Sequence, residues 1–395
     1  MSAQSCQCGC ADRPQVAVPF REYYAKHFKS TLAEGLASRL FQKEKTPVEV
    51  PSDGKSEHTA DQTSKDGEMS LPLRKDFQEA FDARNVSNEY LEHLAYIEKQ
   101  ALEPVVGNSN LMPMQVRDTV HRYLQHVTQL VGLPVQKYFE AATLLDCYHL
   151  KNQDGVSIAT LAVTCSALVM ILKKNDNATA HMSACQLAPH AAQMAQWLQR
   201  RGIPNVAVDV TERMLLAAES NVLEVLEWRI SVPTVESWTS TFCARFNILT
   251  QSLFMASMNW VWQQSLMMSR MIMTRQALSK ETSPQKLAVG LLGLGLVAAQ
   301  LLPGDALRPS KIPPAEWEQL YIESQPQGVM PECVLPKDHA RCLLDIVQAT
   351  VTWGLFELQE ACYLTASVVR DGLMDMQAMQ QAARAQAQSV QHTSL

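Results

Sequence analysis

From Asn88 onward, apolar residues recur at the spacing of an α-helix, and this periodicity constrains the fold more than any other feature of the sequence. Runs that alternate between apolar and polar residues are short. No Asn-Gly or Asp-Gly turn joins two such runs, as a β-hairpin would require. The sequence therefore predicts an all-α protein.

The N-terminal part of the chain has a different composition. Residues 43–70 are rich in Ser, Thr, Lys, Glu and Asp and nearly devoid of large apolar side chains. Such a segment cannot offset its loss of conformational entropy by burying surface. We expect residues 1–85 to form a largely disordered regulatory region, and residues 86–107 to contain the first helix, between Asn88 and Pro104.

A turn at Pro233 divides the helical part of the chain. The segment before it is amphipathic, and its predicted apolar stripe consists of Val222, Val225, Leu226 and Trp228. Because Pro233 disfavours the helical conformation at Val232, the chain must turn before Thr234 starts the next segment.

Five helical segments lie on each side of this turn. The first set predicts a domain at residues 108–233 and the second a domain at residues 234–375, followed by a flexible tail at residues 376–395. The last predicted helix of the second set runs from His339 to Leu364.

The second set contains a helix with an unusually clear start. Ser283 can serve as its N-cap and Pro284 as its first residue. The helix is apolar nearly all round and holds Gly290, Gly293 and Gly295. Their order does not match a dinucleotide-binding loop, so close helix packing explains them better. The apolar run is too short to span a membrane, and we predict a buried core helix.

Charge and cysteine content argue against several classes of function. The net charge is −6, and no basic stripe predicts nucleic-acid binding. The ten cysteines have no repeating framework, which indicates free thiols in a reducing compartment. Cys6, Cys8 and Cys10 cluster, but no second ligand cluster follows at zinc spacing. We therefore predict no metal site and no cofactor.

Several segments, taken in order, resemble the cyclin family over residues 88–370. They are Val116–Val120, Ala141–Tyr148, Leu161–Lys174, Ala218–Leu223 and Ser283–Ala288. Their cyclin counterparts are Met-Arg-Ala-Ile-Leu, Ala-Val-x-x-Leu-Asp-Arg-Phe, the helix ending in Ala-Ser-Lys-x-Glu-Glu, Met-Glu-x-x-Val-Leu and Pro-Ser-x-Ile-Ala. The resemblance implies two tandem five-helix cyclin boxes, and the helix at Asn88 looks like the one that precedes the first box in mitotic-type cyclins.

The resemblance also implies a function. Cyclins have no catalytic residues; they bind and activate a cyclin-dependent Ser/Thr protein kinase, in the nucleus or cytoplasm. Lys173 and Glu219 match the positions that contact the kinase. Spacing alone offers a plainer explanation for both residues. A lysine is common at a helix C-terminus because it suits the helix dipole, and a lone glutamate on a helix is usually solvated.

Two further sites are predicted, the first from the resemblance and the second from a local sequence. A substrate-docking patch maps onto Val116, Val120, Tyr123 and Leu161, although a stripe of this kind is also typical of a plain core. Thr46, in a Thr-Pro sequence within the N-terminal region, is a candidate phosphorylation site.

The chain departs from the family at two places. Arg122 stands where cyclins place the acid that pairs with the residue matching Arg117, so a buried Arg117 needs another partner. Asn175 and Asp176 replace the two acids after Lys173. One alternative is a transcription adaptor like transcription factor IIB, but this acidic chain has no complete zinc ribbon. An enzyme is the third possibility, and no nucleophile–base pair is evident.

Overall fold

The structure is a computed structural model that describes residues 75–103, 112–152, 157–176, 183–203, 206–324 and 337–393. Within these ranges it contains 13 α-helices, α3 to α15, two short 3-10 helices and no strand. The predicted all-α class is therefore confirmed for the described part of the chain.

The first helical group surrounds α7. It contains α5 (Met114–Leu130), α6 (Gln136–Lys151), α7 (Leu161–Asn175), α8 (Ala184–Arg200) and α9 (Glu212–Val225). Helix α7 packs against the other four, and every residue from Leu161 to Leu172 is buried. Residues 158–175 are long and apolar enough to cross a membrane, but 67% of that window is buried inside the protein. A core helix accounts for its composition.

The second helical group surrounds α12. It contains α10 (Val235–Leu249), α11 (Met255–Arg275), α12 (Pro284–Ala298), α13 (Pro314–Glu323), α14 (Lys337–Val351) and α15 (Leu355–Thr393). Helix α12 packs against α10, α11 and α15. Its predicted start is confirmed, because the Ser283 hydroxyl accepts the Lys286 N–H at 3.3 Å and Pro284 is the first residue.

Glycines bring α12 close to its neighbours. A Cβ at Gly290 would lie 2.0 Å from Oγ1 of Thr365, and one at Gly293 would lie 2.5 Å from Sγ of Cys362, both on α15. These distances are far below van der Waals contact, so no larger residue fits without displacing α15. Close helix packing is thus confirmed as the role of these glycines.

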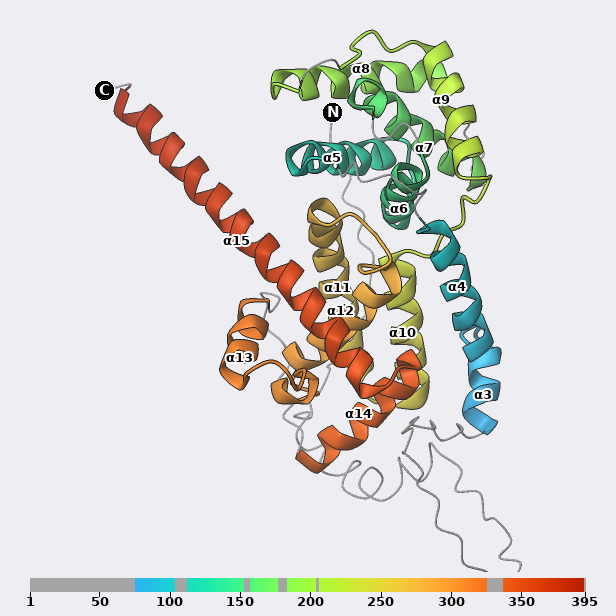
Figure 1. Cartoon of the computed structure of the whole chain (residues 1–395), viewed down its shortest axis with the longest axis vertical. Helices are drawn as coiled ribbons and strands as arrows, with labels where there is room; N and C mark the ends of the chain where they lie inside the picture. The colour runs from blue at the N-terminus through green and yellow to red at the C-terminus, as the bar shows by residue number, and fades with distance from the viewer. Residues whose placement is uncertain are drawn as a thin grey trace, which may run out of the picture.

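The second group has six α-helices in the described residues rather than the five predicted. The predicted helix from His339 to Leu364 is interrupted, because Thr352 adopts a left-handed backbone with φ 61° before Gly354. The next helix, α15, continues as far as Thr393, so residues 376–393 of the predicted flexible tail are helical. Figure 1 shows this long helix crossing the second group and projecting beyond it.

The predicted disordered region ends earlier than residue 85, because α3 (Lys75–Asp82) and the turn after it are ordered. Phe81 is fully buried, and the guanidinium of Arg245 in α10 lies 4.1 Å from its ring centroid. Arg245 also donates to the Val86 carbonyl (2.6 Å) and to Oδ1 of Asn88 (2.8 Å). These contacts cannot be predicted from the composition of the segment, and they offset the conformational entropy that it loses when it becomes ordered. They also fix the start of α4 (Asn88–Ala101), which was predicted correctly.

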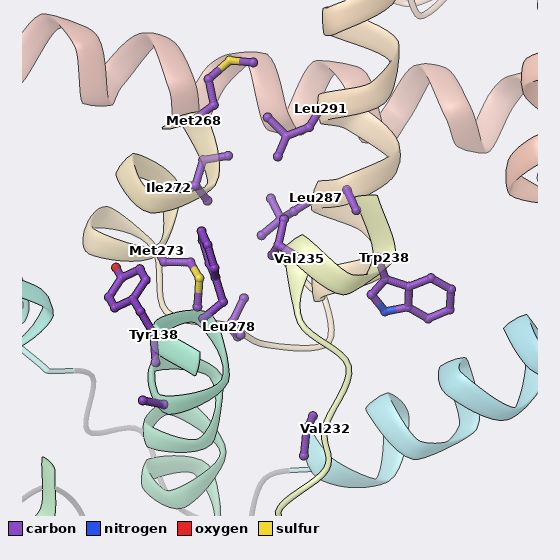
Figure 2. Close-up of a cluster of buried hydrophobic side chains, with 14 of the residues drawn as sticks. Tyr138, Val232, Val235, Trp238, Met268, Ile272, Met273, Leu278, Leu287 and Leu291 are labelled. Carbon is purple, nitrogen blue, oxygen red and sulfur yellow. The ribbon is translucent and has the colours of Figure 1, made fainter. Parts of the chain in front are cut away.

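An apolar contact joins the two groups (Figure 2). Tyr138 of α6 lies close to Met273 of α11, and Val235 and Trp238 of α10 belong to the same cluster of buried side chains. All four side chains are buried. The two groups therefore share one continuous core.

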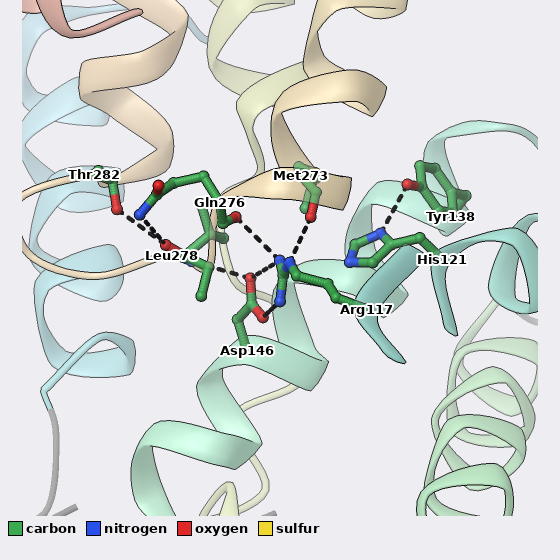
Figure 3. Close-up of polar contacts among 9 residues, drawn as sticks. Arg117, His121, Tyr138, Asp146, Met273, Gln276, Leu278 and Thr282 are labelled. Carbon is green, nitrogen blue, oxygen red and sulfur yellow. Dashed lines mark hydrogen bonds and ion pairs between the residues drawn. The ribbon is translucent and has the colours of Figure 1, made fainter. Parts of the chain in front are cut away.

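A buried polar cluster centred on Arg117 crosses the same contact (Figure 3). Arg117 pairs with both carboxylate oxygens of Asp146, at 2.5 and 2.8 Å. It also donates to the carbonyls of Met273 (2.8 Å) and Gln276 (3.1 Å), at the C-terminal end of α11. Those carbonyls have no partner within the helix, and a cation at this end is electrostatically favourable. Asp146 is thus the partner that a buried Arg117 was expected to need.

Candidate functional site

The C-terminal end of α7 and the middle of α9 carry the residues predicted to contact a kinase. Glu219 lies on α9, which packs along α7. Its two carboxylate oxygens accept from Nζ of Lys174 at 2.6 and 2.8 Å. The Glu219 side chain is 12% exposed and that of Lys174 is 51% exposed, so the pair is reachable from solvent on the lysine side.

Lys173 occupies a different position from its neighbour. Its side chain is half-buried and makes no hydrogen bond or ion pair with another described residue. The structure therefore pairs Glu219 with Lys174 and leaves Lys173 available beside them. Spacing alone did not separate the two consecutive lysines, because both lie in the last turn of α7.

Helix α9 ends in a way that changes the position of Trp228. The helix stops at Val225, and Glu227 and Trp228 both have positive φ, 53° and 61°. The Trp228 N–H donates to the Leu223 carbonyl at 2.8 Å, which closes the helix end. Trp228 is consequently 70% exposed. Its predicted place in the apolar stripe is wrong, because helical spacing does not continue through a left-handed turn; Val222 and Leu226 are buried as expected.

Other exposed apolar side chains extend this surface. Leu216 is 45% exposed and lies three residues before Glu219, on the same face of α9. On α4, Tyr96 is exposed, and its hydroxyl accepts from Gln100, which in turn accepts from Arg229 next to Trp228. We call Lys173, Lys174, Leu216, Glu219 and Trp228 the α7–α9 face. Figure 1 shows α9 on the outside of the first group, above the end of α4.

Non-glycine residues with positive φ are uncommon, and so are large aromatic side chains that are mostly exposed; Trp228 is both. The sequence does contain a signal for this arrangement. Trp228 is followed by Arg229 and then by Pro233, so few helical residues remain to hold the indole in a stripe.

The predicted docking patch is not a surface. Val116, Val120, Tyr123 and Leu161 are all buried, none more than 4% exposed. The Tyr123 hydroxyl is hydrogen-bonded to Ser166 of α7 at 2.5 Å, inside the core. These four side chains therefore belong to the hydrophobic core, which was the alternative interpretation of the stripe. They cannot form a docking patch.

Other predicted positions lie outside the described residues, namely Thr46 and the Cys6, Cys8 and Cys10 cluster. Among the described residues, no group of three or more His, Cys, Asp or Glu side chains is placed to hold a metal ion. Four described cysteines are buried (Cys147, Cys165, Cys243 and Cys362), and burial raises the pKa of each thiol, to about 12 for Cys243. A thiol held in its protonated form is a poor nucleophile.

Comparison of the chain with models of protein families and with curated protein sequences finds no match. The arrangement of the α7–α9 face therefore has to be interpreted from its own chemistry. It offers a carboxylate paired with an exposed lysine, a second lysine and, beyond the end of α9, a projecting indole.

Proposed function

We propose that this chain is a non-catalytic regulatory subunit, similar to a cyclin, that binds and activates a cyclin-dependent Ser/Thr protein kinase through the α7–α9 face. The observation that carries the proposal is the exposure of Trp228, just beyond the C-terminal end of the helix that carries Glu219. Tryptophan is over-represented among the residues that dominate the affinity of protein interfaces, and its indole gains most when it enters a partner's pocket.

The charged residues of this face suit a helix of the partner. Glu219 can accept from the unpaired N–H groups at a helix N-terminus, where the dipole favours an anion. Lys173 can donate to backbone carbonyls. Burial of Leu216 and Trp228 would supply binding free energy, while the charged contacts would fix the register of the partner. A kinase helix held in this way would be kept where its glutamate pairs with the ATP-binding lysine.

The arrangement of the two helical groups supports the same proposal. Each group has one buried helix, α7 or α12, packed against several others. We infer that α5–α9 correspond to the first cyclin box and α10–α15 to the second, the second with an additional helix. The predicted boundary at Pro233 falls between α9 and α10, where Thr234 caps α10 by accepting the Ser237 N–H at 3.0 Å.

The test is co-purification of a kinase from cell extract with the tagged full-length chain, followed by assay of the eluate on a Ser-Pro peptide. We compare wild type with Trp228→Ala and with Lys173→Ala/Glu219→Ala. The matched control is Phe356→Ala, which removes an equally prominent aromatic residue, 67% exposed, from α15. Circular dichroism establishes that all four proteins fold alike.

Wild type and Phe356→Ala should recover kinase activity, and the other two variants should recover at least tenfold less, as expected for interface residues worth more than about 1.4 kcal/mol. Activity recovered equally with all four proteins would place the binding surface elsewhere. If wild type recovers no kinase, the regulatory function is wrong, and an adaptor in transcription becomes the hypothesis to test.

A further inference from the structure

A pocket of about 440 Å³ lies between α5 and α8, away from the residues of the α7–α9 face. Its volume is within the range of small-molecule and side-chain binding sites. Six residues line it: Thr119, Arg122 and His126 from α5, and Trp197, Arg200 and Arg201 from the C-terminal end of α8. Helices α5 and α8 pack against each other, so their packing fixes the backbone on both sides of the pocket.

Three of the six lining residues are arginines, although the surface that the cavity itself presents is mostly apolar. The three arginines have one acidic partner on α5 and α8, the carboxylate of Asp118. Asp118 lies 3.1 Å from Nε of Arg122 and 3.7 Å from Nη1 of Arg201. Three arginines against one aspartate leave two positive charges around the cavity, in a chain whose net charge is −6. This excess is therefore local and does not reflect the overall composition.

The arginines differ in how far they are already held in place. Arg201 donates to the Thr119 hydroxyl at 2.9 Å and lies near Asp118, so its side chain is oriented before any ligand arrives. Arg200 is exposed and has no hydrogen bond or ion pair with another described residue. The position of Arg201 lowers the entropic cost of binding an anion, and Arg200 has no partner that an anion would have to displace.

We propose that this pocket binds a phosphorylated serine or threonine in a peptide segment of a protein partner. A phosphate monoester carries close to two negative charges at neutral pH, which matches the two uncompensated positive charges, whereas a carboxylate carries one. The planar fork of an arginine fits two phosphate oxygens at once. Trp197 is 39% exposed at the edge of the pocket, where its ring can pack against the residue next to the phosphorylated one.

This inference does not depend on kinase activation, because the pocket uses none of the residues of the α7–α9 face. A subunit could bind phosphorylated segments here with or without a kinase on the other surface. The two proposals consequently fail in different experiments.

The test immobilises the purified full-length chain and exposes it to three peptide libraries that differ only at a fixed central residue. That residue is phosphoserine or phosphothreonine in the first library, serine or threonine in the second, and aspartate in the third. Captured peptides are quantified by mass spectrometry, and inorganic phosphate is added as a competitor. The variants are Arg200→Gln and Arg122→Gln/Arg200→Gln. The control is Arg84→Gln, which removes an exposed arginine outside the pocket.

The phosphorylated library should be captured at least tenfold more than the other two. Arg200→Gln should weaken capture about tenfold and the double variant more, as expected for the loss of charge-assisted hydrogen bonds. Arg84→Gln should bind like wild type. Equal capture of the aspartate or unphosphorylated library would overturn the proposal. So would a double variant that binds like the control. Inorganic phosphate that binds as tightly as the peptides would assign the pocket to free phosphate instead.

Discussion

Two buried carboxylates hold the second helical group to the rest of the protein, and they are compensated in different ways. Asp146 forms a two-point ion pair with Arg117 and accepts the Leu278 N–H at 3.1 Å. Glu98 of α4 accepts from Nε1 of Trp238 at 2.6 Å and from the Gln285 N–H at 3.0 Å. No lysine or arginine of the described residues forms an ion pair with Glu98.

The difference shows what a cation contributes that N–H donors do not. Burial raises the pKa of Glu98 to about 7, and the hydrogen bonds from Ser283, Trp238 and Gln285 reverse only part of that shift. Near neutral pH, Glu98 is therefore a mixture of protonated and ionised forms. The contact between α4, α10 and the start of α12 should depend on pH, and three variants test the comparison.

The largest effect is expected from Arg117→Ala. The substitution leaves the Asp146 carboxylate buried without its cation and removes the donor to two carbonyls at the end of α11. Loss of one partner of a buried ion pair costs about 3–5 kcal/mol of the free energy of unfolding. Urea denaturation followed by circular dichroism measures it, with Arg122→Ala, 60% exposed on the same helix, as the control.

A double variant distinguishes loss of the pair from loss of packing. Arg117→Met/Asp146→Leu removes both charges and keeps apolar volume, so it should recover much of the stability lost by Arg117→Ala. If the double variant is less stable than the single one, the hydrogen bond that Asp146 accepts from the Leu278 N–H is worth more than the cost of the unpaired buried charge.

Glu98→Gln should change how stability depends on pH. The unfolded chain protonates Glu98 only below about pH 4.5, whereas the folded chain keeps the proton up to about pH 7. Between these values the folded state binds more protons, so this group's contribution is fully present below pH 4.5 and is lost as the pH rises through 7. The free energy of unfolding falls by up to about 3 kcal/mol through this loss.

Urea midpoints for wild type and variant between pH 4.5 and 8 measure this contribution as a difference, because other buried groups titrate equally in both proteins. Glu98→Gln should become more stable relative to wild type as the pH rises. Glu92→Gln, the same change at an exposed position of α4, should follow wild type. A constant difference between Glu98→Gln and wild type would show that Glu98 does not bind a proton in this range.

Features that depend on local sequence were predicted well. Apolar periodicity identified the helices, and Ser283 with Pro284 marked the start of α12. Local sequence could not identify Asp146 as the partner of Arg117, because the two are 29 positions apart and meet only after α5 and α6 pack. For the same reason, the order of α3 was missed, since it depends on Arg245 from α10. At the candidate site, spacing found Glu219 and the end of α7 but misplaced Trp228, because a left-handed turn breaks the helical register.

The smallest effect on stability is expected at a third carboxylate, Glu219, whose partner Lys174 is 51% exposed. Exposed ion pairs contribute about 0–1 kcal/mol because solvent screens them and the side chains lose entropy. Lys174→Ala should therefore lower the free energy of unfolding by less than 1 kcal/mol in the same urea experiment. A loss above about 2 kcal/mol would mean that the pair is structural. Glu219 would then be committed to Lys174, and its proposed role in accepting hydrogen bonds from a partner would have to be given up.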